Sequence, residues 1–483
     1  MSTIGTVLTV SLSLYALFAI TFLISENRRP QATMAWMLVF FFAPGIGVLI
    51  YGLFGRSKKG FARQGELLRQ DLKVQSSPIL APILSRQESE SAKLEGQSVI
   101  RKKLMMLVRQ NSQSALTAGN QAEILQDASE FYPALIEDLK SAQHSVHLQY
   151  FIWGADSFTE RLKSILIAKA NDGVEVRLLY DPLGSHAHLT SAYVRDLKAA
   201  GVQIVPTAPL YRLHTISYRN HRKITVIDGA IGYTGGMNIG REHLSGGKGF
   251  SSWRDTQLRV VGEAAVILQA VFATDWYNAT RENLFVPEHF PSLPRGSVKS
   301  DVAVQILTSG PDSQWAGIRQ LYFFMIVSAQ RHVLIQSPYF VLDASIAEAL
   351  KSAAMSGVDV KVMLSARASG NRLPEWAGNT FIMDVVSAGV RVFLYQKGYL
   401  HAKTISIDSE ICSIGSANID IRSFSINYEL NAVLYSKKHA TQLEQDFERD
   451  LSHCIEFNAD AYRNSNPVLR FRDSVARLLS PLL

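Results

Sequence analysis

The feature that most constrains the fold of this chain is a long internal repeat. Three short segments recur later in the sequence at a nearly constant offset of 187, 184 or 188 residues. The matched pairs are residues 146–151 with 333–340, 172–176 with 356–360, and 200–202 with 388–390. A repeat of this length predicts two similar domains in tandem rather than a solenoid of short units.

Short β-rich runs alternate with helical stretches from about residue 119 onward, which is typical of an α/β sandwich with mixed or parallel sheets. The predicted strands include Ser145–Trp153, Val174–Tyr180 and Gln203–Val205. We therefore expect an α/β fold with a first domain over 119–290 and a second over 300–483, the latter ending in a C-terminal helix. The two should form one pseudo-symmetric unit, with their boundary in the Pro- and Gly-containing stretch 287–300.

Two apolar segments precede these domains. Residues 4–24 and 32–55 contain no charged side chain over 21 and 24 residues, and each could cross a hydrocarbon core as a helix. A secretory signal peptide fits poorly, because its positively charged start is missing. The sequence thus predicts a membrane hairpin of two transmembrane helices over residues 1–55, followed by a polar connector over 56–118.

The placement of charge favours a membrane surface over a nucleic acid as partner. The formal net charge is +7, and residues 1–60 account for +4 of it although they are the most apolar part of the chain. Basic residues after the second segment outnumber Arg28 and Arg29 between the segments, so the positive-inside rule places the large C-terminal part in the cytoplasm. Pro44 and Gly45 could instead kink the second segment or make it re-entrant, which would reverse the topology.

One further matched segment carries chemistry. His221-x-Lys223 and, 180 residues later, His401-x-Lys403 each lead into an apolar β-branched run that is predicted to be a strand. Side chains two residues apart on a strand share a face, so each lysine should lie beside its histidine.

The aspartates that end these runs, Asp228 and Asp408, lie at odd spacing from the histidines, next to a turn. They should point away from the histidine face and act as turn formers or ion-pair partners.

If the hairpin turns are 229–230 and 409–410, antiparallel pairing fixes which residues face the motifs. The predicted pairs are His221 with Asn238, His401 with Asn418, Lys223 with Gly236, and Lys403 with Ser416. Such a face suits a phosphate, because the lysines neutralise phosphoryl oxygens and the amides and backbone N–H groups donate hydrogen bonds.

Two such faces together would supply one histidine as nucleophile and the other as general acid. Asp255 and Glu429 follow the two histidines at similar distances and could orient the imidazoles. A metal site is a poor alternative, since an ammonium beside the imidazole repels a cation. With only Cys412 and Cys454 in the chain, a cysteine cluster is excluded as well.

At these residues the sequence resembles the phospholipase D superfamily, with its duplicated His-x-Lys-x4-Asp motif followed by Gly-Gly/Ser-x-Asn. More narrowly it is similar to the bacterial cardiolipin synthases. That match rests on the apolar hairpin and on the segments Tyr51–Gly55, Trp253–Asp255, Arg422–Phe424, Asn427–Glu429 and Ala476–Leu483.

The resemblance implies two phospholipase D-like domains at the bacterial inner membrane, in a multi-pass protein. It implies transfer of a phosphatidyl group from one phosphatidylglycerol to another through a phosphatidyl-histidine, giving cardiolipin and glycerol without metal or cofactor. His221 would be the nucleophile and His401 the acid and base, and the family counts Asp228 and Asp408 with the active site.

Several alternatives stay open at this point. The chain could be a phosphodiesterase that hydrolyses phospholipid or nucleic acid, or a catalytically silent membrane scaffold. The C-terminal segment 468–483 could lie on the membrane surface or pack as an ordinary helix. The oligomeric state is also open, and a homodimer is one possibility.

Overall fold

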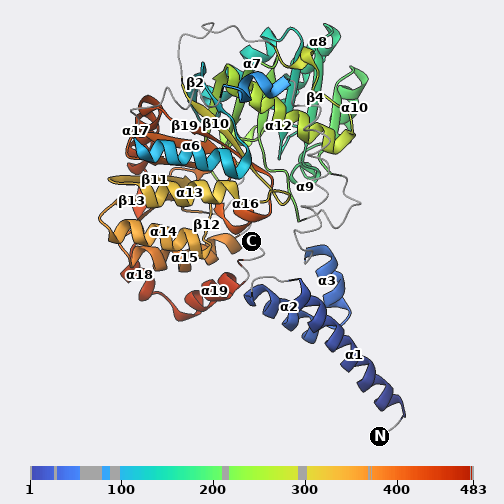
Figure 1. The fold of residues 1–483 in the computed structure, drawn as a ribbon, viewed down its shortest axis with the longest axis vertical. Coiled ribbons are helices and arrows are strands. Elements are labelled where there is room, and N and C mark those ends of the chain that lie inside the picture. The colour runs from blue at the N-terminus through green and yellow to red at the C-terminus, as the bar shows by residue number, and fades with distance from the viewer. Residues whose placement is uncertain are drawn as a thin grey trace.

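The structure is a computed structural model in which an α/β body adjoins three helices from the N-terminus (Figure 1). It describes residues 3–26, 30–54, 79–86, 98–208, 217–247, 249–291, 302–367, 370, 372–478 and 480. The basic residues around 28 and 56–63, on which the predicted topology depends, and most of the predicted domain boundary lie outside the described residues.

The first half of the body is built on a mixed seven-stranded sheet in the order β2-β9-β7-β6-β3-β4-β5. Its strands are β2 (Gln121–Gln126), β3 (Ser145–Tyr150), β4 (Glu175–Tyr180), β5 (Gln203–Pro206), β6 (Ile224–Ile227), β7 (Ile231–Gly235) and β9 (Thr256–Val261). The three strands predicted from the sequence are therefore confirmed as β3, β4 and β5.

The second half has a nine-stranded sheet in the order β1-β10-β19-β17-β16-β11-β13-β14-β20. Its strands are β1 (Leu116–Thr117), β10 (Val304–Ser309), β11 (His332–Ser337), β13 (Asp359–Ser365), β14 (Arg391–Tyr395), β16 (Thr404–Ile407), β17 (Ile411–Gly415), β19 (Glu429–Leu434) and β20 (Cys454–Glu456). Without its two edge strands β1 and β20, this order repeats that of the first sheet strand for strand, which is the structural counterpart of the sequence repeat.

Helices pack on both faces of the two sheets (Figure 1). Those of the first half are α7 (Asp127–Ser141), α8 (Ser157–Asn171), α9 (Pro182–Ser185), α10 (Ser191–Ala199), α11 (Glu242–Ser245), α12 (Glu263–Thr280) and the 3-10 turn Pro287–His289. Those of the second half are α13 (Gly317–Ser328), α14 (Ala344–Met355), α15 (Leu373–Val386), α16 (Ile421–Ser425), α17 (Lys437–Leu451), α18 (Ala459–Arg463) and α19 (Pro467–Leu478). Of these helices, α12 and α17 contribute to the core that the sheets share.

The repeated Gly-Val pairs mark the turns that lead from a helix into a strand. Gly173 and Gly357 follow α8 and α14 with φ values of +87° and +93°, a left-handed conformation that glycine adopts without strain. The valine after each is buried and begins the approach to a parallel strand. The need for glycine at this turn thus explains why the two segments are similar in both halves.

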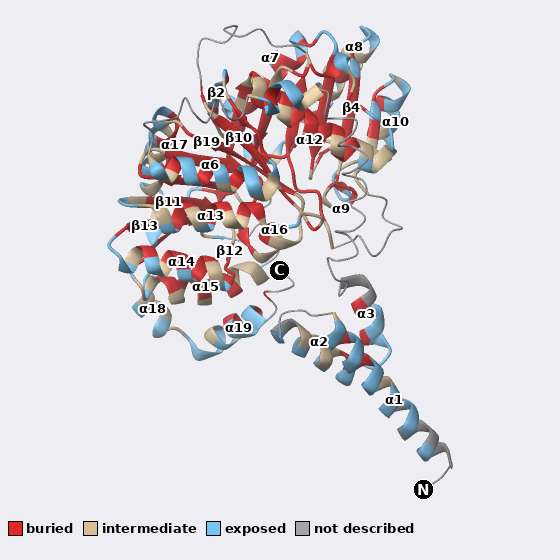
Figure 2. Ribbon diagram, in the orientation of Figure 1, coloured by how far each residue is buried: buried red, intermediate tan, exposed pale blue. Residues whose placement is uncertain are grey.

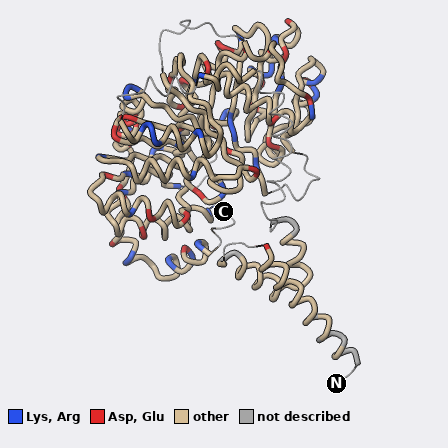
Figure 3. The backbone as a smooth tube through the Cα atoms, viewed as in Figure 1, with Lys and Arg blue, Asp and Glu red and all other residues tan. Residues whose placement is uncertain are grey.

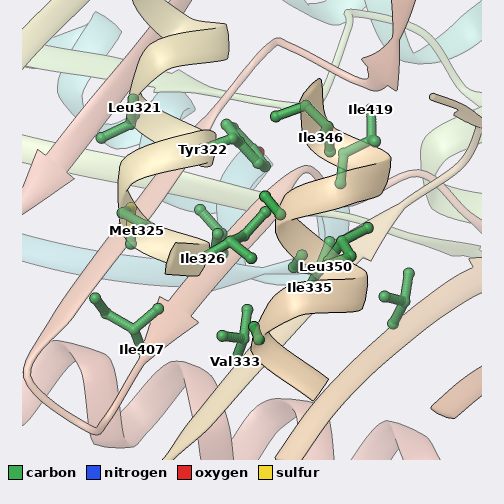
Figure 4. Close-up of a cluster of buried hydrophobic side chains, with 14 of the residues drawn as sticks. Leu321, Tyr322, Met325, Ile326, Val333, Ile335, Ile346, Leu350, Ile407 and Ile419 are labelled. Atoms are coloured by element: carbon green, nitrogen blue, oxygen red, sulfur yellow. The ribbon is translucent and has the colours of Figure 1, made fainter. Parts of the chain in front are cut away.

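Buried apolar side chains form a separate core in each half and a shared core between them. Figure 4 shows part of the core of the second half, a cluster that includes Leu321 and Ile326 of α13 and Val333 and Ile335 of β11. The shared core joins side chains of β6, β9 and α12 to side chains of β10, β17 and β19. The two sheets are therefore layers of one unit, and their packing fixes the position of the two motifs.

Part of the stretch assigned to a polar connector belongs to the fold. Helix α6 (Val99–Ser112) buries Leu104 and Val108 in the core of the second half, and β1 pairs antiparallel with β10. The amphipathic spacing of α6 is what lets one of its faces enter the core although its composition is polar.

The N-terminal helices are α1 (Thr3–Ser25), α2 (Pro30–Phe42) and α3 (Ile46–Phe54). The second apolar segment, predicted as one transmembrane helix, is thus divided into two helices. Pro44 cannot donate a backbone hydrogen bond and Gly45 has a φ of +85°, which together interrupt the helix. No helix in the described ranges combines the length and the apolar character needed to cross a membrane.

Candidate active site

The two histidine motifs meet at the seam between the halves. The His221 N–H donates to the Tyr428 carbonyl oxygen at 2.9 Å, and the His401 N–H donates to the Arg254 carbonyl oxygen at 2.7 Å. Short parallel strands β8 (Trp253–Arg254) and β15 (Tyr399–Leu400) add backbone pairing at the second crossing. Each motif is therefore held by backbone of the opposite half.

The carboxylates beside the two imidazoles are exchanged between the halves. The His221 Nδ1 lies 3.0 Å from Glu429 Oε2, and the His401 Nδ1 lies 2.6 Å from Asp255 Oδ2. Both carboxylates are fully buried. With Nδ1 engaged, each ring is left with Nε2 as its reactive nitrogen.

Burial shifts the pKa values of these pairs. It lowers the pKa of His221, which Glu429 opposes, and it lowers the pKa of His401 well below its usual value, aided by Lys403 and Lys223. The pKa of Glu429 is lowered by His221 and Lys223 despite its burial. Burial therefore favours the neutral form of both imidazoles, and a bound anion would raise their pKa.

The motif lysines are buried next to the histidines. The Lys223 Nζ donates to the His221 carbonyl oxygen at 2.6 Å, and the Lys403 Nζ makes the same bond to the His401 carbonyl. Burial lowers the pKa of Lys223 to about 7 and that of Lys403 to about 8. A bound phosphate would supply the negative charge that two ammonium groups at this depth require.

The motif aspartates lie at the far end of the hairpins, away from the histidines. Asp228 accepts backbone hydrogen bonds from residues 143, 144 and 145 at 2.7–2.9 Å, and Asp408 accepts them from residues 330, 331 and 332 at 2.7–3.0 Å. Each carboxylate thus joins the hairpin turn to the start of β3 or β11.

The predicted hairpin register is wrong by one residue in both halves. Ile227 pairs with Ile231 and Ile407 with Ile411, so each loop has three residues rather than two. Asp228 and Asp408 adopt φ values of +51° and +54°, which makes them part of the loop. The predicted pairs of His221 with Asn238 and Lys223 with Gly236, and their counterparts in the second half, therefore do not form across the ladder.

Asn238 and Asn418 nevertheless border the same cavity as the histidines. Asn238 Oδ1 accepts the Ile152 N–H at 3.1 Å, which leaves its NH2 group as a donor. Asn418 Nδ2 donates to Asp420 Oδ2 at 3.2 Å.

The two small residues of the motifs support the carboxylates. A Cβ atom on Gly236 would lie 2.0 Å from Asp255 Oδ1, so no other residue fits there without displacing that carboxylate. In the second half the Ser416 hydroxyl donates to Glu429. Gly236 and Ser416 are thus matched to the carboxylate of their own half rather than to a lysine.

A cavity of about 720 Å³ contains both histidines. Its other lining residues are Phe151, Ile152, His188, Arg219, Asn238, Glu242, Gly247, Trp253, Tyr339, Val341, Gly370, Pro374, Tyr399, Asn418, Asp420, Arg422 and Asn427. Both imidazoles therefore face one shared cavity, as joint action on one phosphate group requires.

Sequence reasoning missed the aromatic wall of this cavity. The rings of Trp253 and Tyr399 lie 5.3 Å and 5.8 Å from the His401 ring, and the ring of Phe151 lies 4.9 Å from that of His221. Trp253 was available from the sequence as the residue two before Asp255. His243, whose ring lies 4.6 Å from that of Trp253, carries no motif signal.

Among the described residues, one group of side chains could bring metal-ligand atoms together away from this cavity: His147, Glu175 and His289. The Arg177 guanidinium lies 3.4 Å from His147 Nε2 and also bonds to Glu175. A positive charge in this position opposes a bound cation.

Comparison with known protein families finds the same division of the chain into two halves. The family profile described as "Cardiolipin synthase, PLD-like domain" matches residues 135–276 and 322–451, one match in each half. The chain belongs to the cardiolipin synthase family of the phospholipase D superfamily. A second profile, described as phospholipase D-nuclease N-terminal, matches residues 11–56 of this family member.

Named relatives cover nearly the whole cardiolipin synthase-family chain. It is 39% identical to a cardiolipin synthase of Geobacillus thermodenitrificans, over 96% of this chain and 91% of that protein. It is 36% identical to the major cardiolipin synthase of Bacillus subtilis over the full length of both. Among solved structures, phosphatidylserine synthase of Haemophilus influenzae matches 79% of this chain and 100% of its own with a TM-score of 0.61 at 16% identity, which shows a shared fold.

Proposed function

We propose that this enzyme makes cardiolipin by transferring a phosphatidyl group from one phosphatidylglycerol molecule to another, with release of glycerol. The observation that carries the proposal is the pair of buried histidine–carboxylate contacts that open into one cavity, in a chain of the cardiolipin synthase family. Each histidine has a carboxylate to hold its ring, and two lysines are present to bind the phosphoryl oxygens.

In the first step the Nε2 of His221 attacks the phosphorus of the donor lipid. The bond between phosphorus and the headgroup oxygen breaks, and His401 gives its proton to the departing glycerol. Lys223 and Lys403 balance the charge on the phosphoryl oxygens, and Asn238 donates to one of them. The product of this step is phosphatidyl-His221.

In the second step the headgroup hydroxyl of another phosphatidylglycerol gives its proton to His401 and attacks the same phosphorus. The phosphorus–nitrogen bond breaks, which frees His221 and forms cardiolipin. The number of phosphodiester bonds does not change, so the reaction needs no nucleotide.

The N-terminal helices are proposed to hold the enzyme in the bacterial inner membrane as a multi-pass anchor, with the catalytic body in the cytoplasm. Described side chains of α1 and α2 such as Leu17, Phe18 and Phe41 are exposed, and charged residues are nearly absent there (Figures 2 and 3). Exposed apolar surface of this extent is typical of contact with lipid.

Helix α19 provides a second proposed membrane contact. Val468, Phe471, Val475 and Leu478 are exposed at helical spacing, while Asp473 on the opposite face is buried and accepts from Asn379 of α15. In Figure 1, α19 and the N-terminal helices both lie at the lower end of the molecule. The first turn of α15 contributes Pro374 to the cavity, so α19 would bring the membrane surface near the site.

The test is to incubate the purified enzyme in detergent with phosphatidylglycerol and EDTA, and to identify the products by mass spectrometry. Cardiolipin and free glycerol are the expected products. Phosphatidic acid without cardiolipin would mean that water resolves the intermediate, and the enzyme would then be a phospholipase D-type hydrolase.

The order of the histidines is tested by trapping. Rapid acid-free quenching during turnover and peptide mass spectrometry should find the phosphatidyl adduct on the peptide that contains His221. An adduct on the peptide that contains His401 would reverse the two roles.

A further inference from the structure

The cavity is chemically different at its two ends, although the catalytic residues are the same. Arg219 lies two residues before His221, whereas Tyr399 holds the same place before His401. Arg422 lies four residues after Asn418, whereas Glu242 lies four residues after Asn238. All four side chains line the cavity, so the repeat has diverged where it touches substrate.

The two arginines belong to the end of the cavity beside His221. The Tyr428 N–H donates to the Arg219 carbonyl at 2.9 Å, and the Asn427 N–H donates to the Arg422 carbonyl at 2.9 Å. The two residues that directly precede β19 therefore hold the backbone of both arginines. The opposite end contains Trp253 and Tyr399 around His401.

Each of the two guanidinium groups is anchored by a contact to the fold. The Arg219 Nη1 lies 3.4 Å from Asp181 Oδ1, and the Arg422 Nη2 donates to the Ser217 carbonyl at 2.7 Å. Burial lowers the pKa of Arg422, the carboxylate of Asp420 opposes this shift, and the charge of Arg219 adds to it. The two guanidinium charges thus repel each other, and a bound anion would reduce that repulsion.

The carboxylate of Asp181 is shared with other groups. It also accepts the backbone N–H groups of Leu183 and Gly184, each at 3.0 Å, where it caps α9. Asp181 therefore holds the backbone at the start of α9 as well as the Arg219 guanidinium.

The proposed reaction places two phosphates in the site at once. The reacting phosphate lies between the histidines and has the two lysines. The acceptor carries its own phosphate at the far end of its glycerol headgroup, and that group also needs a cationic partner. At the aromatic end, the Glu242 carboxylate would repel it.

We infer that Arg219 and Arg422 form a second anion subsite that binds the phosphate of the acceptor lipid, which deepens the proposed function and rests on it. A phosphate-bearing acceptor is thereby favoured over water and over uncharged alcohols. The aromatic end around Trp253 and Tyr399 is left for uncharged parts of the substrates.

The experiment measures competition between two acceptors in one reaction. The enzyme in mixed micelles is given phosphatidylglycerol together with ethanol, and the ratio of cardiolipin to phosphatidylethanol is determined by mass spectrometry. Because both products come from the same intermediate, the ratio does not depend on how much of a variant is folded. We expect Arg422→Met and Arg219→Met each to lower the ratio about 10- to 100-fold, and Arg422→Lys to lower it less.

Arg391→Met is the matched control, since Arg391 is exposed and pairs with Glu456 at 3.0 Å outside the cavity. It should leave the ratio unchanged. An unchanged ratio in the Arg219 and Arg422 variants, or an equal loss of both products, would overturn the inference.

A measurement without variants guards against misfolding. With the unaltered enzyme, isotope-labelled glycerol phosphate should be a better acceptor than isotope-labelled glycerol at equal concentration, and equal use of the two would refute the subsite. The label is needed because transfer to glycerol gives phosphatidylglycerol, which is also the donor. If the unaltered enzyme forms no cardiolipin at all, the proposed function fails, while the comparison of glycerol phosphate with glycerol still decides the fate of the subsite.

Discussion

At the scale of single residues, the carboxylate behind each imidazole controls the state of that ring. Replacing Glu429 by Gln keeps the shape of the contact to His221 but removes the charge that raises the pKa of its imidazole. We expect Glu429→Gln to lower kcat about 100- to 10,000-fold. Because the pKa of His221 falls further in the variant, the acidic limb of the pH–rate profile should move to lower pH.

The protein contains a matched control for this change. Glu444 also pairs with a histidine, His332, at 3.0 Å, but this pair lies outside the cavity. Glu444→Gln should leave the pH–rate profile of the enzyme in place. If both variants lost activity to the same extent with no shift in profile, Glu429 would have only a structural role.

The lowered lysine pKa values predict how anion binding depends on pH. Lys223, with a pKa of about 7, and Lys403, with a pKa of about 8, lose their protons as the pH rises from about 6 to about 9. Only the protonated forms attract an anion, so affinity should fall through this window. Tungstate keeps a constant charge in this pH range, so titration calorimetry with tungstate measures how the anion affinity changes with pH.

Lys403→Met should reduce this slope, since one of the two titrating groups is removed. The unliganded enzyme should change in the opposite sense: the unfolded chain keeps these lysines protonated to about pH 10, so its stability should rise with pH above 7. Tungstate affinity that does not depend on pH would show that the lysines stay charged in the empty site.

At the scale of elements, the three-residue hairpin loops give the motif aspartates their role. Asp228 accepts three backbone N–H groups, and Asp228→Ala would leave them without that partner. We expect a loss of about 3 kcal/mol in the free energy of unfolding, measured by thermal or urea unfolding.

His221→Ala provides the contrast, because it should abolish activity with little change in unfolding. Asp228→Ala should show the reverse balance, with a much larger loss of stability than of activity per folded molecule. A large loss of activity at unchanged stability would show instead that Asp228 takes part in catalysis.

The sequence predicted elements better than it predicted their register. The strands β3, β4 and β5 follow from short apolar runs in the sequence. The loop length did not follow, because the sequence does not show whether Asp228 ends the strand or begins the loop with a left-handed φ. In the structure Asp228 lies in the loop, and its carboxylate accepts backbone N–H groups at the start of β3.

At the scale of the whole molecule, the exchange of carboxylates could not be read from the sequence. Asp255 and Glu429 were identified as partners of the imidazoles, but their spacing is similar in both halves and does not distinguish a partner within a half from one across the seam. Only the packing of the two sheets decides this.

The exposed stripe of α19 gives a prediction at the same scale. Exchanging Phe471 and Leu478 for serine removes apolar side chains that are 71% and 79% exposed, so folding should be nearly unaffected. Binding to vesicles that contain phosphatidylglycerol should weaken about 10-fold or more, measured by vesicle sedimentation. Met355→Ser, an exposed apolar position on α14, is the control and should bind like the unaltered enzyme.

The exchanged carboxylates also bear on how such an enzyme arose. Each half supplies a histidine to one pair and a carboxylate to the other, which is the reciprocal pattern of a two-fold symmetric dimer. In a dimer of identical chains, any mutation alters both ends of the site at once. Fusion of the two copies into one chain removes this restriction, and one end can then gain Arg219 and Arg422 while the other keeps Tyr399 and Glu242. A reaction that joins two identical lipids in different roles benefits when the two ends of the site can change independently.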